Sequence, residues 1–342
     1  RGHGAGGGTG SVPPLGPPER SCWTMQLAPV FLTSPLKSET LCVRFSPDNA
    51  FLAAASASGA VSIFNVSTTQ EAYRLNRAGG HPTKQVCWRP EPEGASLRTR
   101  GILVGASTDG KLRQWHVTSS QLLAEWGEPE RTQQLFCVDY SPDGSQMVAG
   151  GMAELFVFDE ETKKEVVHLK GGDSVNTGGH TSRVYAARFH PLPSEPSVVI
   201  SGGWDKNVQF WDLRVGHAVR AIFGPEVTGD SLDISRDGRR LLTGSWREKE
   251  PLEVWDVAEG RRLEALPWRS ARSVPAPSCY LYTARFSREP AGAFVAAGGS
   301  ASSADGSGEA KVLAADGDGS KCVGTVVDFT CLTADFSGPA AG

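Results

Sequence analysis

His180, Ser201 and Asp205 carry the side chains of a nucleophilic triad, and they stand close together along the chain. Such a triad uses the serine as nucleophile, the histidine as general base and the aspartate to orient the imidazole. It also needs an exposed serine on a strained turn and donors for the oxyanion, which often accompany a G-x-S-x-G motif. Residues 198–203 read VVISGG and lack that motif. A hydrolase is therefore a disfavoured alternative, which buried side chains at these positions would eliminate.

Other motifs that resemble binding sites are incomplete. Gly105 to Lys111 has the spacing of a phosphate-binding loop, but Leu112 replaces the serine or threonine that would hold magnesium. That stretch also runs from strand to turn to strand, whereas a phosphate loop leads into a helix. Residues 316–320 resemble the start of a calcium loop, but Lys321 stands where glycine is required. The histidines and cysteines show no zinc spacing. We therefore predict no metal, no cofactor and no enzymatic activity.

The elements that hold these residues read as short strands. Between Gly179 and Leu213 lie three apolar runs, at 184–189, 198–201 and 208–211. Each run is too short for a helix, is rich in β-branched or aromatic residues and is bounded by turn residues. The stretch opens with Gly179-His180 and closes with Trp211-Asp212.

Several strands with Gly-His near the start and Trp-Asp near the end are typical of one propeller blade. This stretch resembles the WD-repeat β-propeller family, and the rest of the chain reads as degenerate copies of it. Each copy contains an aromatic or apolar residue followed by Ser-Pro or its equivalent, and these markers recur every 43 to 52 residues. The marker residues are Phe45, Trp88, Tyr140, Phe189, Ile234, Phe286 and Phe336. The array predicts an all-β, seven-bladed WD-repeat β-propeller.

The seventh unit is incomplete in this sequence. Residues 1–24 are rich in glycine and proline and are expected to be disordered, so the propeller would occupy residues 25–342. Residues 331–336 supply only the first strand of the seventh unit. A ring has to close, because an open array exposes strand edges. The segment Gln26–Leu32 resembles the N-terminal strand that completes the last blade in this family. Whether missing C-terminal residues or another chain supply the remaining strands, and whether Met25 is the true start, stay open.

The resemblance implies a buried hydrogen-bond chain inside a blade, built from histidine, serine or threonine, aspartate and tryptophan. The matching residues are His180, Ser201, Asp205 and Trp211. The second unit keeps His81, Asp109 and Trp115, but Gly105 stands where the fourth unit has Ser201. On this interpretation the three polar residues stabilise the blade and do no catalysis.

The resemblance also implies a docking face around the central channel. In each unit the residue four places before the marker would reach this face, and the residue before the strand-connecting aspartate would join it. The expected partner-binding residues are Lys84, Phe136, Tyr185, Trp204, Trp246, Arg247 and Tyr282. Leu41, Asp230, Leu332 and Thr108 occupy equivalent positions. Exposed aromatic residues with arginine are frequent anchors of protein interfaces.

Composition disfavours several classes of function. The net charge is −4 and basic residues form no long block, which disfavours nucleic acid as a principal partner. The sequence contains no run of eighteen apolar residues, so it predicts no membrane span. Seven cysteines, odd in number and without a C-x-x-C pair, indicate a reducing, intracellular compartment.

These observations predict a non-enzymatic scaffold that binds other proteins within a larger assembly. The expected location is the cytoplasm, with a cytoskeletal or ciliary complex as the setting and the nucleus not excluded. The alternative is a peptide-recognition module, such as a chromatin reader or a ubiquitin-ligase substrate receptor, that uses the aromatic face. The fold alone does not choose between these settings.

Overall fold

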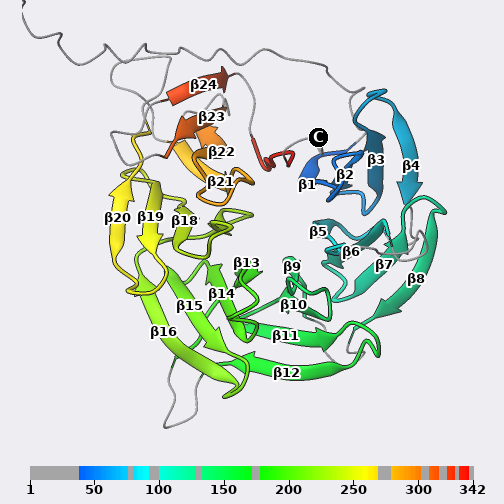
Figure 1. Cartoon of the computed structure of the whole chain (residues 1–342), viewed down its shortest axis with the longest axis horizontal. Helices are drawn as coiled ribbons and strands as arrows, with labels where there is room; N and C mark the ends of the chain where they lie inside the picture. The colour runs from blue at the N-terminus through cyan, green and yellow to red at the C-terminus, as the bar shows by residue number, and fades with distance from the viewer. Residues whose placement is uncertain are drawn as a thin grey trace, which may run out of the picture.

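The computed structural model describes residues 38–75, 80–91, 100–127, 133–171, 178–268, 279–301, 308–315, 322–327 and 331–338. These residues form six four-stranded antiparallel sheets, or blades, arranged around a centre (Figure 1). Strands that follow one another in the chain are neighbours in each blade. The predicted strand at 26–32 and the segment 1–24 lie outside the described residues.

The first three blades contain strands β1 to β12. They are β1 Thr40–Phe45, β2 Phe51–Ser56, β3 Val61–Asn65 and β4 Glu71–Leu75 in blade 1; β5 Thr83–Trp88, β6 Ile102–Ser107, β7 Leu112–His116 and β8 Gln121–Trp126 in blade 2; and β9 Cys137–Tyr140, β10 Gln146–Gly150, β11 Glu154–Asp159 and β12 Glu165–Lys170 in blade 3.

The next three blades contain strands β13 to β24. They are β13 Val184–Phe189, β14 Val198–Gly203, β15 Asn207–Asp212 and β16 His217–Phe223 in blade 4; β17 Leu232–Ile234, β18 Arg240–Gly244, β19 Leu252–Asp256 and β20 Arg262–Ala265 in blade 5; and β21 Cys279–Phe286, β22 Phe294–Ala301, β23 Gly308–Ala314 and β24 Cys322–Val327 in blade 6.

The first strand of each blade lies at the centre of the ring and the fourth at the rim. In Figure 1 the labels β1, β5, β9, β13 and β21 surround the centre, while β4, β8, β12, β16, β20 and β24 lie outside. In every blade the pairing between the third and fourth strands shifts near the WD position, for example between Phe210 and Trp211. Such a bulge increases the local twist, and it recurs in each repeat.

The Ser-Pro markers form the turn between the first two strands. In blade 1 the Ser46 hydroxyl donates to Asp48 at 2.6 Å and accepts from the Phe51 amide at 2.9 Å. In blade 3 Ser141 makes the same two bonds with Asp143 and Gln146. Serine and aspartate favour such turns because their short side chains bond to nearby backbone groups. The marker therefore ends each inner strand at an equivalent place.

The apolar cores lie between neighbouring blades. One core joins blades 1 and 2 through residues such as Cys42, Leu75 and Trp115, and four more follow around the ring to blades 5 and 6. Each sheet has two faces to bury, and a ring of sheets buries both against its neighbours. This packing fixes the angular position of each inner strand and so of the residues that line the channel.

Residues 331–338 lie between blade 6 and blade 1, in red beside β1 in Figure 1. The Cys331 amide donates to the Gly299 carbonyl at 3.3 Å, and the Ala334 amide donates to Thr283 Oγ1 at 3.1 Å. On the other side Thr333 Oγ1 accepts from the Val43 amide at 3.0 Å. The sequence predicted a strand here. Among the described residues the segment pairs with no other strand, and its bonds to blade 1 run through the side chains of Thr333 and Asp335.

Candidate functional site

Blade 4 brings His180, Ser201, Asp205 and Trp211 together. His180 Nε2 lies 2.7 Å from Ser201 Oγ, and His180 Nδ1 lies 2.9 Å from Asp205 Oδ2. The Trp211 indole N–H donates to the same Ser201 oxygen at 2.8 Å. Asp205 also accepts from the amide of Thr181, the residue after the histidine, at 2.8 Å. The bonds therefore tie β14 and β15 to the segment that enters β13.

The electrostatics of this network favour an ionised aspartate. Burial acts to raise the pKa of Asp205, but the hydrogen bond and charge of His180 and the Thr181 amide outweigh it, so the pKa is lowered. The side chains of His180 and Asp205 are almost completely buried. A buried network whose donors and acceptors are paired holds its elements in one arrangement.

The same geometry contradicts the hydrolase alternative. Ser201 is 0% exposed, and its oxygen is shared between His180 and Trp211. A nucleophile has to reach a substrate carbonyl, whereas this hydroxyl lies inside the sheet on β14. We therefore exclude catalysis by this trio.

Blade 2 departs from the expected network. His81 is exposed, and the Asp109 carboxylate forms an ion pair with Arg113. Trp115 is buried, and a Cβ atom on Gly105 would lie 3.0 Å from its ring. The indole therefore occupies the space that a serine would need. Arginine at position 113 competes for the aspartate, so the three predicted residues do not form one chain of hydrogen bonds.

A cavity of about 280 Å³ opens at one mouth of the channel. The residue four places before each marker lines it in every unit, including the seventh. These residues are Leu41, Lys84, Phe136, Tyr185, Asp230, Tyr282 and Leu332. Trp204 and Trp246, from the connections after β14 and β18, complete the wall. The inner strands start at this mouth, so their first residues point into the same space.

Five aromatic rings form a continuous row here, which we call the aromatic row: Phe136, Tyr185, Trp204, Trp246 and Tyr280. The centroid distances between neighbours along the row are 5.1, 6.1, 5.9 and 4.5 Å. Rings at such distances stabilise one another and form a stiff surface. Trp204 is the most open of them, at 42% exposed.

Tyr280 was missing from the sequence prediction. It stacks on Trp246, whereas the predicted Tyr282 lines the cavity without a ring contact in the row. Tyr280 lies on the extension of β21, which has 8 residues where β1, β5 and β13 have 6, so it stands two residues before the position that the count from the marker selects. The only feature of the sequence that could have pointed to Tyr280 is the pair of tyrosines at positions 280 and 282.

The two predicted cations have different environments. Lys84 is half-buried in the cavity wall, and burial lowers the pKa of its ammonium group. Arg247 is not among the residues that line the cavity. It forms an ion pair with Glu253 at 2.6 Å and donates to the Glu250 carbonyl. Arg247 therefore stabilises its own loop, and Thr108 also lies away from the cavity wall.

Asp230 forms the charged floor of the cavity. Its carboxylate pairs with Arg44 and Arg188 and accepts from Gln85 Nε2 at 2.8 Å. Burial acts to raise the pKa of Asp230, but Arg44, Arg188 and Arg285 outweigh it and lower that pKa strongly. Four blades therefore meet at one carboxylate in the middle of the channel.

The described residues contain no cluster of histidine, cysteine, aspartate and glutamate that could hold a metal ion. In that same part of the chain no helix is long and apolar enough to cross a membrane. The six described cysteines are free thiols, and four of them are buried.

Comparison with known proteins gives matches in the same repeats. The family model "WD domain, G-beta repeat" matches residues 32–65 and 172–212. The small ribosomal subunit protein RACK1y of Oryza sativa subsp. japonica is 32% identical over 105 residues, covering 31% of this chain and 30% of that protein. Coronin-7 of Bos taurus is 34% identical over 100 residues, covering 26% and 11%. The nuclear distribution protein PAC1 of Arthroderma otae is 28% identical over 145 residues, covering 39% and 30%.

These matches span less than a third of each of the three relatives. The matched segment 172–212 contains the residues of the blade 4 network from His180 to Trp211. Repeats, sheet order and the family model agree: residues 32–65 and 172–212 match the WD repeat, and the described residues fold as blades of a β-propeller.

Proposed function

We propose that this protein is a non-enzymatic scaffold that docks partner proteins on the aromatic row. The observation that carries the proposal is the row itself, because its rings come from blades 3 to 6, four of them line the first cavity and Trp204 is open to solvent. Large aromatic side chains contribute most of the binding energy in many interfaces, since they bury much area at a small entropic cost.

The stiffness of the row supports a preformed docking surface. Each ring packs against its neighbour and is carried by an inner strand, by the residue directly before one, or by the connection that follows a second strand. A surface that is already ordered loses little conformational freedom on binding. The Arg183 guanidinium lies 5.9 Å from the Phe136 ring and adds a cation at the edge of the row.

A peptide-recognition module is the second candidate. The concave shape of the cavity favours it, because a volume of about 280 Å³ can take one inserted side chain. A folded partner would instead span the rim and the exposed Trp204. The two functions predict different behaviour of short peptides, which would bind with full affinity only in the second case.

We further propose a ring of seven blades, with residues 331–338 as the inner position of the seventh and the segment 26–32 as its closing strand. Asp335 supports this assignment, because it accepts from the Phe45 amide at 2.9 Å. Asp139 and Asp233 make the same bond to Phe189 and Phe286 in the next blade. The repetition of this one contact supports the proposed position of the segment after blade 6 and before blade 1.

We propose a cytoplasmic, multi-subunit assembly as the setting, with a cytoskeletal or ciliary complex as the specific expectation. The free thiols are consistent with a reducing compartment. Fluorescent tagging at either end of the full-length protein would test the location, and a secreted or membrane-enclosed signal would contradict it.

The docking proposal is tested by affinity capture and quantitative mass spectrometry. Three proteins are compared: the wild type, the double variant Tyr185→Ala with Trp204→Ala, and the control Phe223→Ala. Phe223 is 76% exposed on β16, away from the cavity wall, so the control removes an exposed aromatic without touching the row. The proposal expects one group of partners to disappear only from the double variant. Equal capture by all three folded proteins would refute it.

A further inference from the structure

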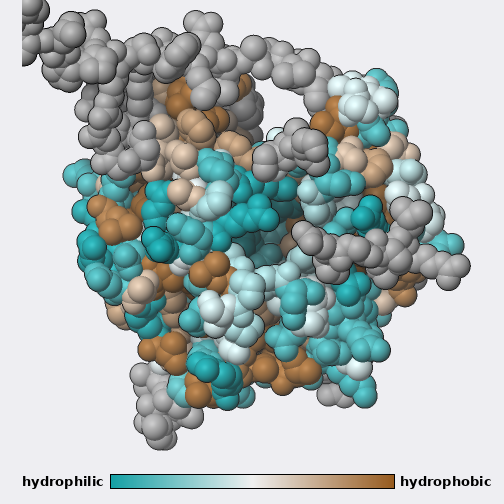
Figure 2. Space-filling model, in the orientation of Figure 1, coloured by the Kyte–Doolittle hydropathy of each residue, from teal (hydrophilic) through white to brown (hydrophobic). Residues whose placement is uncertain are grey.

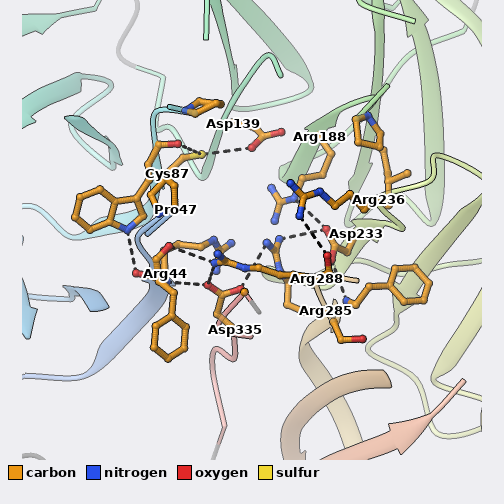
Figure 3. A pocket seen from close by; sticks show the side chains of 18 of the residues that line it. Arg44, Pro47, Cys87, Asp139, Arg188, Asp233, Arg236, Arg285, Arg288 and Asp335 are labelled. Carbon is orange, nitrogen blue, oxygen red and sulfur yellow. Dashed lines mark hydrogen bonds and ion pairs between the residues drawn. The ribbon is translucent and has the colours of Figure 1, made fainter. Parts of the chain in front are cut away.

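A second cavity, of about 500 Å³, opens at the other mouth of the channel (Figure 3). The marker turns surround it, because Pro47, Pro90 and Pro191 are among its lining residues. The inner strands run from the first cavity to this one, so the residues at their ends line it. Figure 2 shows one face of the ring, with hydrophilic residues around a central hollow.

Charged residues alternate around this end of the channel. The position before the marker carries one residue from each unit: Arg44, Cys87, Asp139, Arg188, Asp233, Arg285 and Asp335. Arg236 and Arg288, from the marker turns of blades 5 and 6, join them at the mouth. Five guanidinium groups therefore face three carboxylates, and we call this space the arginine cavity.

The three carboxylates of the cavity are already bound to backbone donors. Asp139, Asp233 and Asp335 each accept from the amide of the marker residue in the next blade, at 2.9 to 3.0 Å. Arg44 and Arg188 extend to Asp230 deeper in the channel. These bonds hold the blades together, and they leave part of the guanidinium surface without an acceptor.

The free donors belong mainly to blades 5 and 6. Arg285 Nε and Nη1 are buried and have no hydrogen-bond acceptor in the described part of the chain. The nearest carboxylate oxygen to Nη1 is that of Asp233, at 3.5 Å. Arg188 Nε is equally without an acceptor there, on a side chain that is 7% exposed. Arg236 is exposed at the mouth and makes one 3.4 Å contact with a backbone carbonyl.

A buried donor without an acceptor destabilises the protein unless a ligand or solvent satisfies it. Guanidinium groups bind the oxygens of phosphate and carboxylate in pairs of parallel hydrogen bonds. A cationic ligand is disfavoured, because the arginines that line the cavity outnumber its carboxylates. The volume lies in the range of small-molecule sites, which is roughly 300–1,000 Å³.

We propose that the arginine cavity binds a small, multiply charged oxyanion, held by Arg285 from the wall and by Arg236 from the mouth. The ligand carries phosphate or carboxylate groups, and its oxygens take the donors that Arg285 leaves free. Its site is separate from the aromatic row, because Asp230 and its arginine partners lie between the two cavities.

The test is isothermal titration calorimetry on the full-length protein at physiological ionic strength, where weak surface pairing is screened. Pyrophosphate represents phosphate-bearing ligands and citrate represents carboxylate-bearing ones. We expect saturable binding of one molecule of at least one of them. Loss of a charge-assisted hydrogen bond in Arg285→Gln weakens this binding by about tenfold or more.

Two further variants keep the test decisive. Arg236→Gln changes an exposed side chain, so it retains the fold even if Arg285→Gln does not, and it also weakens binding. Arg214→Gln is the matched control, because Arg214 is an exposed arginine that pairs with Asp212 outside the cavity. We expect Arg214→Gln to bind the anion with the affinity of the wild type. Absence of saturable binding to both anions, or equal loss in all three variants, would overturn the proposal.

Discussion

Asp230→Asn removes the one charge that the deepest arginines share. The carboxylate pairs with Arg44 and Arg188, whose side chains are 7% exposed, and Asp230 itself is 5% exposed. Asparagine has nearly the same shape, so packing is kept. Its amide has one acceptor oxygen in place of two. Arg44 loses its ion pair with Asp230, and Arg188 keeps only the 3.8 Å pair with Asp233.

The expected loss of stability follows from this burial. Removing one partner of a buried ion pair destabilises a protein by about 3–5 kcal/mol, since the other charge stays buried and unpaired. At a denaturant slope of about 3 kcal/mol/M, the urea midpoint would fall by roughly 1 to 2 M. Tryptophan fluorescence reports the transition.

Asp212→Asn is the matched control. Asp212 pairs with Arg214 at 2.6 Å, but the arginine side chain is 74% exposed. An exposed pair contributes less than about 1 kcal/mol. The two variants make the same chemical change, and only burial differs. A loss below 1 kcal/mol in Asp230→Asn, or equal losses in both variants, would refute the account of the channel floor.

Three further predictions concern the network, the aromatic row and pH. Ser201→Ala leaves the Trp211 indole and one nitrogen of His180 buried without a partner, so thermal unfolding should show a loss of about 1–3 kcal/mol for each orphaned group; an unchanged melting temperature would contradict the network. Trp204→Ala should change stability by less than about 1 kcal/mol because the side chain is 42% exposed, and a large loss in the same assay would show that this ring belongs to the core. Because folding lowers the pKa of Asp230, the ionised carboxylate stabilises the folded protein fully above the unfolded pKa of about 3.9, and this stabilisation is lost as pH falls through the lower pKa of the folded state. The free energy of unfolding, measured by urea titrations from pH 5 to pH 2, should therefore decline more steeply for the wild type than for Asp230→Asn. Parallel declines in the two proteins would contradict the lowered pKa.

The fold was largely predictable because each blade repeats one marker. The Ser-Pro turns gave the end of every inner strand, and the residue four places earlier gave the wall of the first cavity in each unit. The register shift on the first strand recurs at the same distance from the marker in blades 1, 2, 4 and 6, so counting from the marker suffices. The count does not reach Tyr280, because this ring lies two residues before the counted position, on the longer strand β21.

Other features depend on distances that one sequence does not show. The sequence gives no sign that Arg113 would bind Asp109 in place of His81, because this depends on which side chain lies within bonding distance of the carboxylate in the folded blade. Nor does a single repeat show the alternation of Arg188 and Asp233 around the channel. That pattern has meaning only once the inner strands of different blades stand side by side.

The most direct test of the docking account is site-specific photo-crosslinking in living cells. p-Benzoylphenylalanine is placed at position 204, in the aromatic row, or at position 223, on the outer strand β16. The account predicts covalent adducts to a defined set of proteins from position 204, and their absence from position 223. Adducts from position 223 alone, with a folded protein in both cases, would contradict it.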